Sequence, residues 1–381
     1  MHICHVTPHL PPDQAANALL PFHLGTWAQQ AGDDVCFVSH PPRAGGDVPL
    51  PGPVVWIPAA PRGWLARATR LASLRTAIGT IRTARPALDA ADVVHLHSNG
   101  LLIEMCGAIA RARRKPQVLT LYGTEIWHYR RPRLRPDLFT QAYREADVVT
   151  FYSRGLRDRA RELGLDRDDL EVVYPPVAAQ FHPPEPAARQ AMRDELGAPC
   201  EHLLLNVKRL HPLAGQRDLI QAMPAVLERY PDTRLTICGT GPLLDDLQTL
   251  AGRLGVGRRV VFAGLVENRV MARYYAASDL FVLPSLLEAC PTVALEALAC
   301  GTPVVSTDNP GGVELGALFG PDVTIVPRAN PGQLADAICG ALARPRRTLD
   351  ATREVLLHHF RPTVVARRYR DAYRTALARH S

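Results

Sequence analysis

Short runs of apolar, mostly β-branched residues recur along the chain, and helix-like segments separate them. Continuous apolar runs of this kind indicate strands buried on both faces, as in parallel sheets covered by helices. The pattern therefore predicts two doubly wound α/β domains. The predicted strands are residues 2–7, 34–39, 54–58, 92–98, 117–122, 147–153 and 171–175, and then 203–207, 234–239, 260–264, 280–285, 303–307 and 323–327.

The clustered prolines of PPVAAQFHPPEPAA (175–188) indicate a stiff linker between the two sets of strands. We therefore expect one domain over 1–180 and a second over 189–358. The remaining segment, 359–381, has helical periodicity, and we expect this helix to pack back on the first domain. Ligands bind beyond the carboxyl ends of strands in open α/β sheets, so a cleft between two such domains is the expected binding site. The apolar stripe of the last helix consists of Val364, Val365, Tyr369, Tyr373 and Leu377.

Composition narrows the class of protein. With 381 residues, 47% of them hydrophobic, the chain can fill the cores of two domains. The net charge of +7 is spread over both halves, which gives little support to nucleic-acid binding. No apolar run is long enough to span a bilayer and no leader peptide is apparent. The eight scattered cysteines form no C-x-x-C pair, so we expect a cytoplasmic protein, with the inner membrane face as the alternative location.

The stretch EACPTVALE places acids at both ends of a predicted loop-to-helix transition, Glu288 and Glu296. Pro291 suits the first position of a helix. The N–H groups of Thr292 and Val293 would then point out of a positive helix end, which suits a diphosphate. Glu296 would lie about 7 Å further along the axis, at about 1.5 Å per residue, within reach of the hydroxyls of an attached ribose. Glu288 would face the opposite end of that ligand, the sugar being transferred.

This E-x7-E stretch is followed by A-x-A-x-G-x-P-V-V and preceded by GTGP and RVVFAGLVENRVMARYYAASDLFVLPS (259–285). Together these motifs resemble the signature of retaining GT-B glycosyltransferases of family 4, most strongly over 203–315. The resemblance implies two Rossmann-like domains facing across a cleft, 1–180 for the acceptor and 189–358 for a nucleotide sugar. It implies sugar transfer from a nucleotide diphosphate sugar with retention at the anomeric carbon, without a structural metal or cofactor.

The resemblance also implies roles for charged residues. Glu296 would hold the ribose and Glu288 would support the donor sugar in the transition state. Arg209 matches an arginine that binds the diphosphate, whereas the lysine expected five residues later is Ala214. Lys208 or Arg217 is expected to supply the missing charge, and Lys208 is favoured because only two lysines occur in the chain. The predicted catalytic set is Glu288, Arg209 and Lys208.

Two loops complete the predicted donor site. Gly239 and Gly241 belong to GTGP, which follows a predicted strand. The family's paired glycines after the first strand are replaced here by Ala15 and Ala16, which still permit a fairly close backbone approach but not a positive φ. The predicted donor-binding residues are Glu296, Thr292, Val293, Gly239, Gly241 and Ala16.

The first domain supplies the predicted sugar and acceptor pocket. After the fifth strand the family often has His-Gly, and this chain has LYGTEIWHY, so Tyr122 stands in the histidine position and Gly123 keeps the turn. Glu125 and His128 follow as further candidates, and Asp13 lies in the loop after the first strand. The alternative for Tyr122 and Glu125 is packing at a strand end.

No metal site is assigned from the sequence. His95 and His97 lie on one predicted strand, and we expect them to point to opposite faces, which argues against chelation by this pair. Asp166 and Asp168 lie in a polar loop and are expected to be solvated.

Two kinds of acceptor fit the sequence of the first domain. Residues 62–85 carry six arginines and no acid, so this segment is either a membrane-surface helix or an ordinary amphipathic helix on the sheet. A lipid-linked or cell-envelope acceptor would fit the first interpretation. Acids in the first domain, Asp13, Glu104 and Glu125, instead favour a soluble cationic acceptor such as an aminocyclitol or amino sugar of a secondary metabolite. UDP is the expected nucleotide, and a non-catalytic nucleotide-sugar binding protein is the alternative class.

Overall fold

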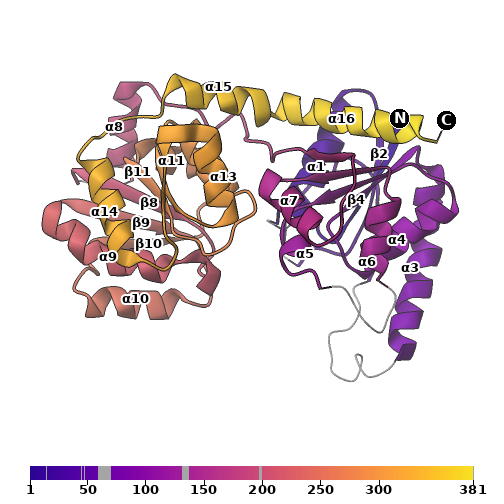
Figure 1. Ribbon diagram of the computed structural model, residues 1–381, viewed down its shortest axis with the longest axis horizontal. Coiled ribbons are helices and arrows are strands. Elements are labelled where there is room, and N and C mark those ends of the chain that lie inside the picture. The colour runs from indigo at the N-terminus through magenta and orange to yellow at the C-terminus, as the bar shows by residue number, and fades with distance from the viewer. Residues whose placement is uncertain are drawn as a thin grey trace. The chain divides into compact units, whose positions relative to one another are not determined.

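The computed structural model divides into two compact units (Figure 1). The first unit is Met1–Tyr174 with Thr363–Ser381, and the second is Pro175–Pro362. The proline-rich segment 175–188 thus lies within the second unit. The structure describes residues 1–380 except 14, 44, 47, 59–69, 131–136 and 197–199.

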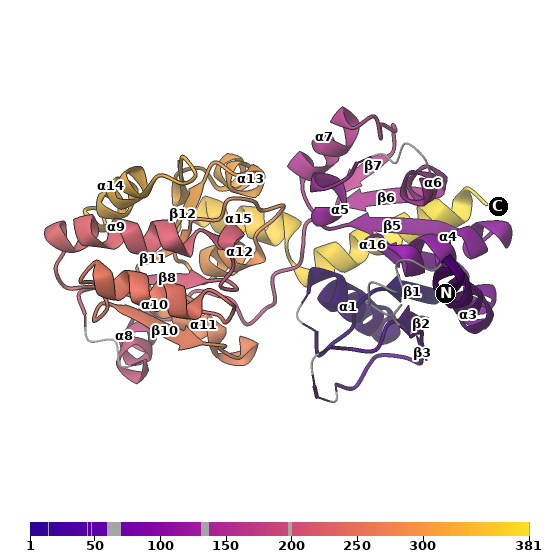
Figure 2. The ribbon, with the colours of Figure 1, turned by 90° about the horizontal axis from the view of Figure 1, so that it is seen from below.

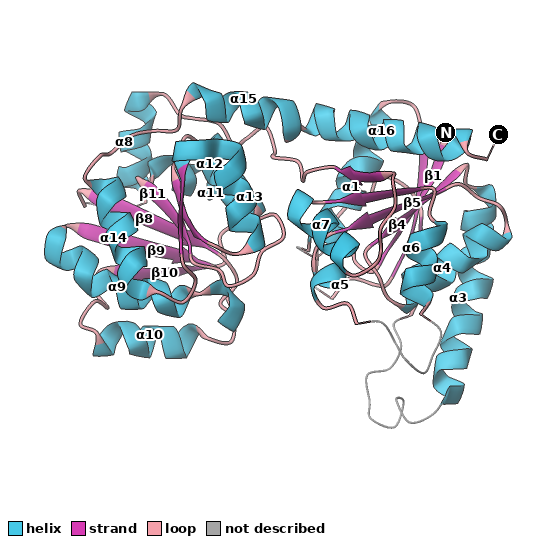
Figure 3. Ribbon diagram, in the orientation of Figure 1, coloured by secondary structure: helices cyan, strands magenta, loops and turns pink. Residues whose placement is uncertain are grey.

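The first unit is a seven-stranded parallel sheet in the order β3-β2-β1-β4-β5-β6-β7, with helices on its faces (Figures 2 and 3). Its strands are β1 (His2–Thr7), β2 (Asp34–Ser39), β3 (Val54–Trp56), β4 (Val93–His97), β5 (Gln117–Leu121), β6 (Val148–Phe151) and β7 (Leu170–Val172). Its helices are α1 (Ala16–Gln30), α3 (Arg70–Ala90), α4 (Leu101–Ala112), α5 (Thr124–Trp127), α6 (Leu138–Glu145), α7 (Arg154–Glu162) and α16 (Pro362–Ala378).

The second unit has a six-stranded parallel sheet in the order β10-β9-β8-β11-β12-β13. Its strands are β8 (His202–Val207), β9 (Thr233–Cys238), β10 (Val260–Gly264), β11 (Leu280–Leu283), β12 (Val304–Thr307) and β13 (Val323–Val326). Its helices are α8 (Pro186–Glu195), α9 (Gln216–Arg229), α10 (Leu244–Arg253), α11 (Asn268–Ala277), α12 (Thr292–Ala299), α13 (Pro310–Phe319), α14 (Pro331–Leu342) and α15 (Asp350–His359), with short 3-10 turns at Pro212–Ala214 and Gly320–Asp322.

Both predicted sheets are confirmed, and every predicted apolar run overlaps a strand. Strands such as β4 and β5 are buried at every position, because helices cover both faces of a parallel sheet. The C-terminal helix α16 packs on the first unit, as expected. It buries Val365, Tyr369 and Tyr373 there, and Arg370 binds Asp33 at 2.7 Å.

The strand order reverses at one point in each sheet, between β1 and β4 in the first unit and between β8 and β11 in the second. Loops that leave two such strands diverge to opposite sides, and the crevice between them is where doubly wound folds bind ligands. The candidate donor residues after β8 and β11 lie at this point of the second unit.

The structure also bears on whether a helix could cross a membrane, on the cysteines and on the arginine-rich segment. Among the described residues, no helix is both long and apolar enough to cross a membrane. The eight cysteines are free thiols, and most are buried as small apolar side chains. Of the segment 62–85, residues 62–69 lie outside the described part of the chain, and the rest belongs to helix α3.

Candidate active site

The two strands at the reversal point of the second sheet bring a cation and an acid together. Lys208 follows β8 and Glu288 follows β11, and these strands pair in parallel with Leu204 opposite Leu280. The Lys208 Nζ lies 2.6 Å from Glu288 Oε1. Both side chains are partly shielded, since 31% of Lys208 and 11% of Glu288 are exposed. This contact joins residues 80 positions apart, and it favours Lys208 as the replacement for the missing lysine.

Helix α12 begins four residues after Glu288, at Thr292, and offers its N-terminus to the same crevice. Pro291 is the N-cap residue and the helix runs Thr292–Ala299, one residue later than predicted. No side chain caps this end, and the first intrahelical bonds are donated by Ala294 and Leu295 to the Pro291 carbonyl. The N–H groups of Thr292 and Val293 precede those bonds and are therefore oriented outward, in the manner of an anion-binding helix start.

Glu296 lies one turn further along α12 and is largely buried. The Tyr275 hydroxyl on α11 donates to its Oε2 at 2.8 Å. Burial raises the pKa of the Glu296 carboxyl to about 7, and the Tyr275 hydrogen bond partly opposes that rise. Burial therefore favours the neutral form of this acid more than water would.

The loop that carries Glu288 is held by helix α13, a contribution that the sequence analysis missed. The Glu288 carbonyl accepts the Gly311 N–H at 2.9 Å. A Cβ at Gly311 would lie 3.0 Å from the Glu288 Cβ, so glycine allows this close approach. Asn309 caps α13 through Gly312 N–H and donates to the Ser285 carbonyl at 3.1 Å. The sequence NPGG after a strand was the available signal, because Asn is a favoured N-cap and Pro a favoured first residue.

The remaining predicted donor residues differ in exposure. Arg209 is exposed, and no ion pair to it occurs among the described residues. Ala214 is buried in the 3-10 turn, so a longer side chain would not fit there without rearrangement. Arg217 is exposed in the first turn of α9.

The two glycines of GTGP allow the loop after β9 to approach the loop that carries Lys208. A Cβ at Gly239 would lie 2.1 Å from the Lys208 carbonyl oxygen, and one at Gly241 would lie 2.2 Å from the Leu210 carbonyl oxygen. Gly239 also has a φ of +142°, which other residues adopt rarely. These glycines therefore fix the backbone beside Lys208.

The predicted pocket residues of the first unit are largely engaged with their own loops. The Glu125 carboxylate accepts the Gly123 N–H at 2.7 Å and the Tyr122 N–H at 3.4 Å. Asp13 accepts the Arg43 N–H at 3.0 Å and also contacts His9 at 3.0 Å.

Of the other predicted residues in this unit, two are exposed to solvent and one is hydrogen-bonded to a buried histidine. Ala16 is the exposed first residue of α1, and His128 is exposed at the end of α5. The Tyr122 hydroxyl shares a hydrogen bond of 2.7 Å with His97 Nδ1. Its aromatic ring also lies edge-on to Tyr152, with centroids 4.6 Å apart.

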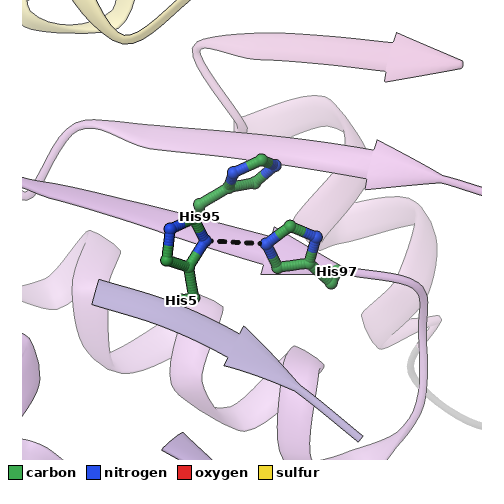
Figure 4. Close-up of side chains that lie close together, drawn as sticks. All are labelled: His5, His95 and His97. Carbon is green, nitrogen blue, oxygen red and sulfur yellow. Dashed lines mark hydrogen bonds between the residues drawn. The ribbon is translucent and has the colours of Figure 1, made fainter. Parts of the chain in front are cut away.

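The expectation that His95 and His97 point to opposite faces is wrong. Side chains two positions apart on a strand share a face, because only successive residues alternate. Their rings are 3.8 Å apart, and His5 of the neighbouring strand β1 completes a buried group of three (Figure 4). His5 Nδ1 and His97 Nε2 share a hydrogen bond of 3.0 Å.

This histidine cluster (His5, His95 and His97) has the spacing of a metal site, with one ligand atom from each ring within 4.8 Å of the others. Five of its six ring nitrogens, however, are hydrogen-bonded within the fold, and His5 Nε2 alone has no partner among the described residues. His95 binds the hydroxyls of Tyr373 at 2.9 Å and Thr120 at 2.7 Å. The cluster contains no carboxylate to offset a cation in a fully buried setting. We therefore assign it a structural role that joins α16 to the sheet.

Two doubly wound parallel sheets with a C-terminal helix returning to the first define the GT-B class of fold. The structure resembles sucrose-phosphate synthase from Thermosynechococcus elongatus, with a TM-score of 0.78 at 20% identity over 100% of both chains. It also resembles Anabaena Alr3699/HepE in complex with UDP, with a TM-score of 0.75 at 18% identity over 98% of this chain and 100% of that one. These likenesses establish the fold.

The sequence places the chain within that class. Residues 22–176 match the family described as glycosyl transferase 4-like domain, and 188–354 match glycosyl transferases group 1. The chain therefore belongs to the group 1 glycosyltransferases of family 4, which confirms the resemblance inferred from its motifs.

The chain matches several named glycosyltransferases over part of their length. The GDP-mannose-dependent alpha-(1-6)-phosphatidylinositol monomannoside mannosyltransferase of Mycolicibacterium smegmatis is 34% identical over 253 residues, 64% of this chain and 66% of that protein. D-inositol 3-phosphate glycosyltransferase 2 of Catenulispora acidiphila is 34% identical over 208 residues, 52% of this chain and 48% of that protein. The chain thus spans about half to two thirds of the relatives it matches.

Proposed function

We propose that the protein is a retaining glycosyltransferase that moves a hexose-type sugar from a nucleotide diphosphate sugar to a hydroxyl group. The observation that carries this proposal is the Lys208–Glu288 pair at the strand reversal point, beside the open start of α12. A cation, an acid and outward N–H groups meet there, as a diphosphate with an attached sugar requires. Glu296, on the same helix, is proposed to accept the ribose hydroxyls.

The chemistry proposed is displacement on one face of the sugar. The acceptor oxygen bonds to the anomeric carbon as the bond from that carbon to the diphosphate oxygen breaks, and the departing diphosphate takes the acceptor proton. Arg209, Lys208 and the N–H groups of Thr292 and Val293 stabilise the charge that develops on the diphosphate. The Glu288 carboxylate stabilises the positive charge on the sugar.

For the acceptor, we propose a soluble polyhydroxylated ring of the cyclitol type. Inositol-containing acceptors appear in the names of both curated relatives, which supports a cyclitol. A cationic group on the acceptor gains little support, because Asp13 and Glu125 are engaged with backbone N–H groups. The alternative acceptor is lipid-linked, since one relative acts on a phosphatidylinositol mannoside.

A panel of nucleotide sugars tests the proposal, because a ligand that binds only the folded state raises its melting temperature. The panel includes UDP-glucose and GDP-mannose, since UDP occurs in a structural neighbour and GDP-mannose in the name of a relative. We expect one nucleotide to raise the melting temperature and to be turned over when free cyclitols or vesicles with phosphatidylinositol are added. Absence of any shift, or binding without release of nucleotide with any acceptor, would overturn the proposal.

Replacing Lys208 by alanine should lower kcat/KM for the donor about ten- to a hundred-fold, because the leaving diphosphate loses a nearby cation. Arg217→Ala, which removes a charge from the exposed first turn of α9, should change kcat/KM less than about two-fold. Steady-state kinetics with varied donor measures both. A larger loss in Arg217→Ala would show that Arg217, and not Lys208, replaces the lysine missing at Ala214.

A further inference from the structure

The pair formed by Tyr275 and Glu296 is built into the core of the second unit. Tyr275 is fully buried on α11, with its ring edge-on to Phe181 and Phe281 at centroid distances of 5.8 and 5.6 Å. Its carbonyl accepts the Thr302 hydroxyl at 2.6 Å. The tyrosine therefore cannot move freely, and its hydroxyl is presented to Glu296 Oε2 from a fixed position.

The surroundings of Glu296 leave this hydroxyl as its main polar partner. Within the described ranges, no cation lies within ion-pair distance of the Glu296 carboxylate. The titratable groups that interact with it are Tyr275 from α11 and Cys300 at the end of α12. Helix α15 and strands β11 and β12 also pack against α12, and no titratable group described on them interacts with the Glu296 carboxylate.

A carboxylate has about four lone-pair directions, and Tyr275 uses one of them. The Oε1 atom and the remaining direction on Oε2 are left for a ligand. Two neighbouring hydroxyls of a ribose need acceptors at both oxygens in a fixed orientation. A buried carboxylate without a partner would instead rotate or become protonated.

We propose that Tyr275 is a positioning residue of the donor site, which holds the Glu296 carboxylate in the orientation that accepts the ribose hydroxyls. This inference rests on the proposed function, since it takes Glu296 as the ribose-binding acid. Tyr275 does not touch the donor itself. It acts by fixing one oxygen of Glu296 and by favouring the ionised form.

Donor binding should depend on pH through the ionisation of Glu296. Only the ionised carboxylate offers acceptors to both hydroxyls, so donor affinity should fall as the pH is lowered through the Glu296 pKa of about 7. The Tyr275 hydrogen bond lowers that pKa. Its removal should therefore raise the pKa and move the acid limb of donor binding to higher pH.

The test is calorimetric titration of the full chain with UDP-glucose and with GDP-mannose between pH 6 and pH 9, together with donor kinetics at pH 7.5. We expect Tyr275→Phe to weaken donor binding about ten-fold at pH 7.5, the loss of one hydrogen bond to a charged group. Donor KM should rise while kcat stays nearly constant, and the acid limb should move upward. Glu296→Gln should bind weakly and without an acid limb.

Tyr274→Phe is the matched control, because it removes a hydroxyl from the adjacent residue, which has no described contact with Glu296. It should keep the affinity and pH profile of the natural protein. A Tyr275→Phe protein with unchanged acid limb and KM, even if it melts at a lower temperature, would overturn the inference. If Glu296→Gln binds donor normally at every pH, the proposed role of Glu296 is wrong. If only Glu296→Gln is impaired, that role stands and the role of Tyr275 is wrong.

Discussion

Replacement of Glu288 by glutamine should reduce kcat for sugar transfer by about 10²- to 10³-fold and leave donor binding intact. Catalytic groups that stabilise charge only in the transition state have effects of this size when removed. Glutamine keeps the shape of the side chain but cannot offset a positive sugar. It also releases Lys208 from its 2.6 Å contact, so the ammonium remains available to the diphosphate and donor affinity should hold or improve. Single-turnover rates and calorimetric donor binding separate these two effects.

Glu314→Gln provides a matched control for the loss of one negative charge. Glu314 lies on α13, the helix whose Gly311 holds the Glu288 carbonyl, so it shares the region without belonging to the proposed machinery. Its kcat should stay within about two-fold of the natural protein, as for most partly exposed charges. A Glu288→Gln protein that retains more than about a third of kcat would rule out the proposed role of Glu288.

Strand positions were predictable because both sheets are parallel and fully covered. A strand buried on two faces is apolar at most positions, and that pattern stands out from the amphipathic helices between strands. The start of α12 was predictable to within one residue, since proline restricts the backbone before a helix. The C-terminal helix was recognisable from its stripe, in which Val365, Tyr369 and Tyr373 are four residues apart.

Contacts between distant strands were not predictable in the same way. The Lys208–Glu288 pair forms because β8 lies next to β11. The hydrophobic pattern of each strand does not determine the order of the strands in the sheet. The same holds for Tyr275 and Glu296, which the packing of α11 on α12 brings together. In the histidine cluster, the two-residue repeat of a strand puts His95 and His97 on one face, and His5 joins them only through the pairing of β1 with β4.

Acidification from pH 7 to pH 5 should destabilise the first unit by up to about 6 kcal/mol, at about 1.4 kcal/mol per histidine and pH unit below 6.5. Burial lowers the pKa of His5 to about 3 and lowers those of His95 and His97 well below the usual value. The unfolded chain therefore binds more protons than the folded chain below pH 6.5, so stability falls as the pH falls through that window. A loss of this size is comparable with the whole stability of a typical domain.

Hydrogen exchange measured separately on peptides of each unit can detect this difference. Between pH 7 and pH 5 the second unit should instead gain up to about 2 kcal/mol, because folding raises the pKa of Glu296 and its protonation then favours the folded state. Within the first unit, burial also lowers the pKa of His23. His5→Gln should therefore reduce the slope of stability against pH by about a quarter to a third, since one of the proton-binding histidines is lost. His128→Gln, at an exposed position, should leave that slope unchanged. Equal slopes in the natural protein and in His5→Gln would show that the fold does not exclude protons from the cluster.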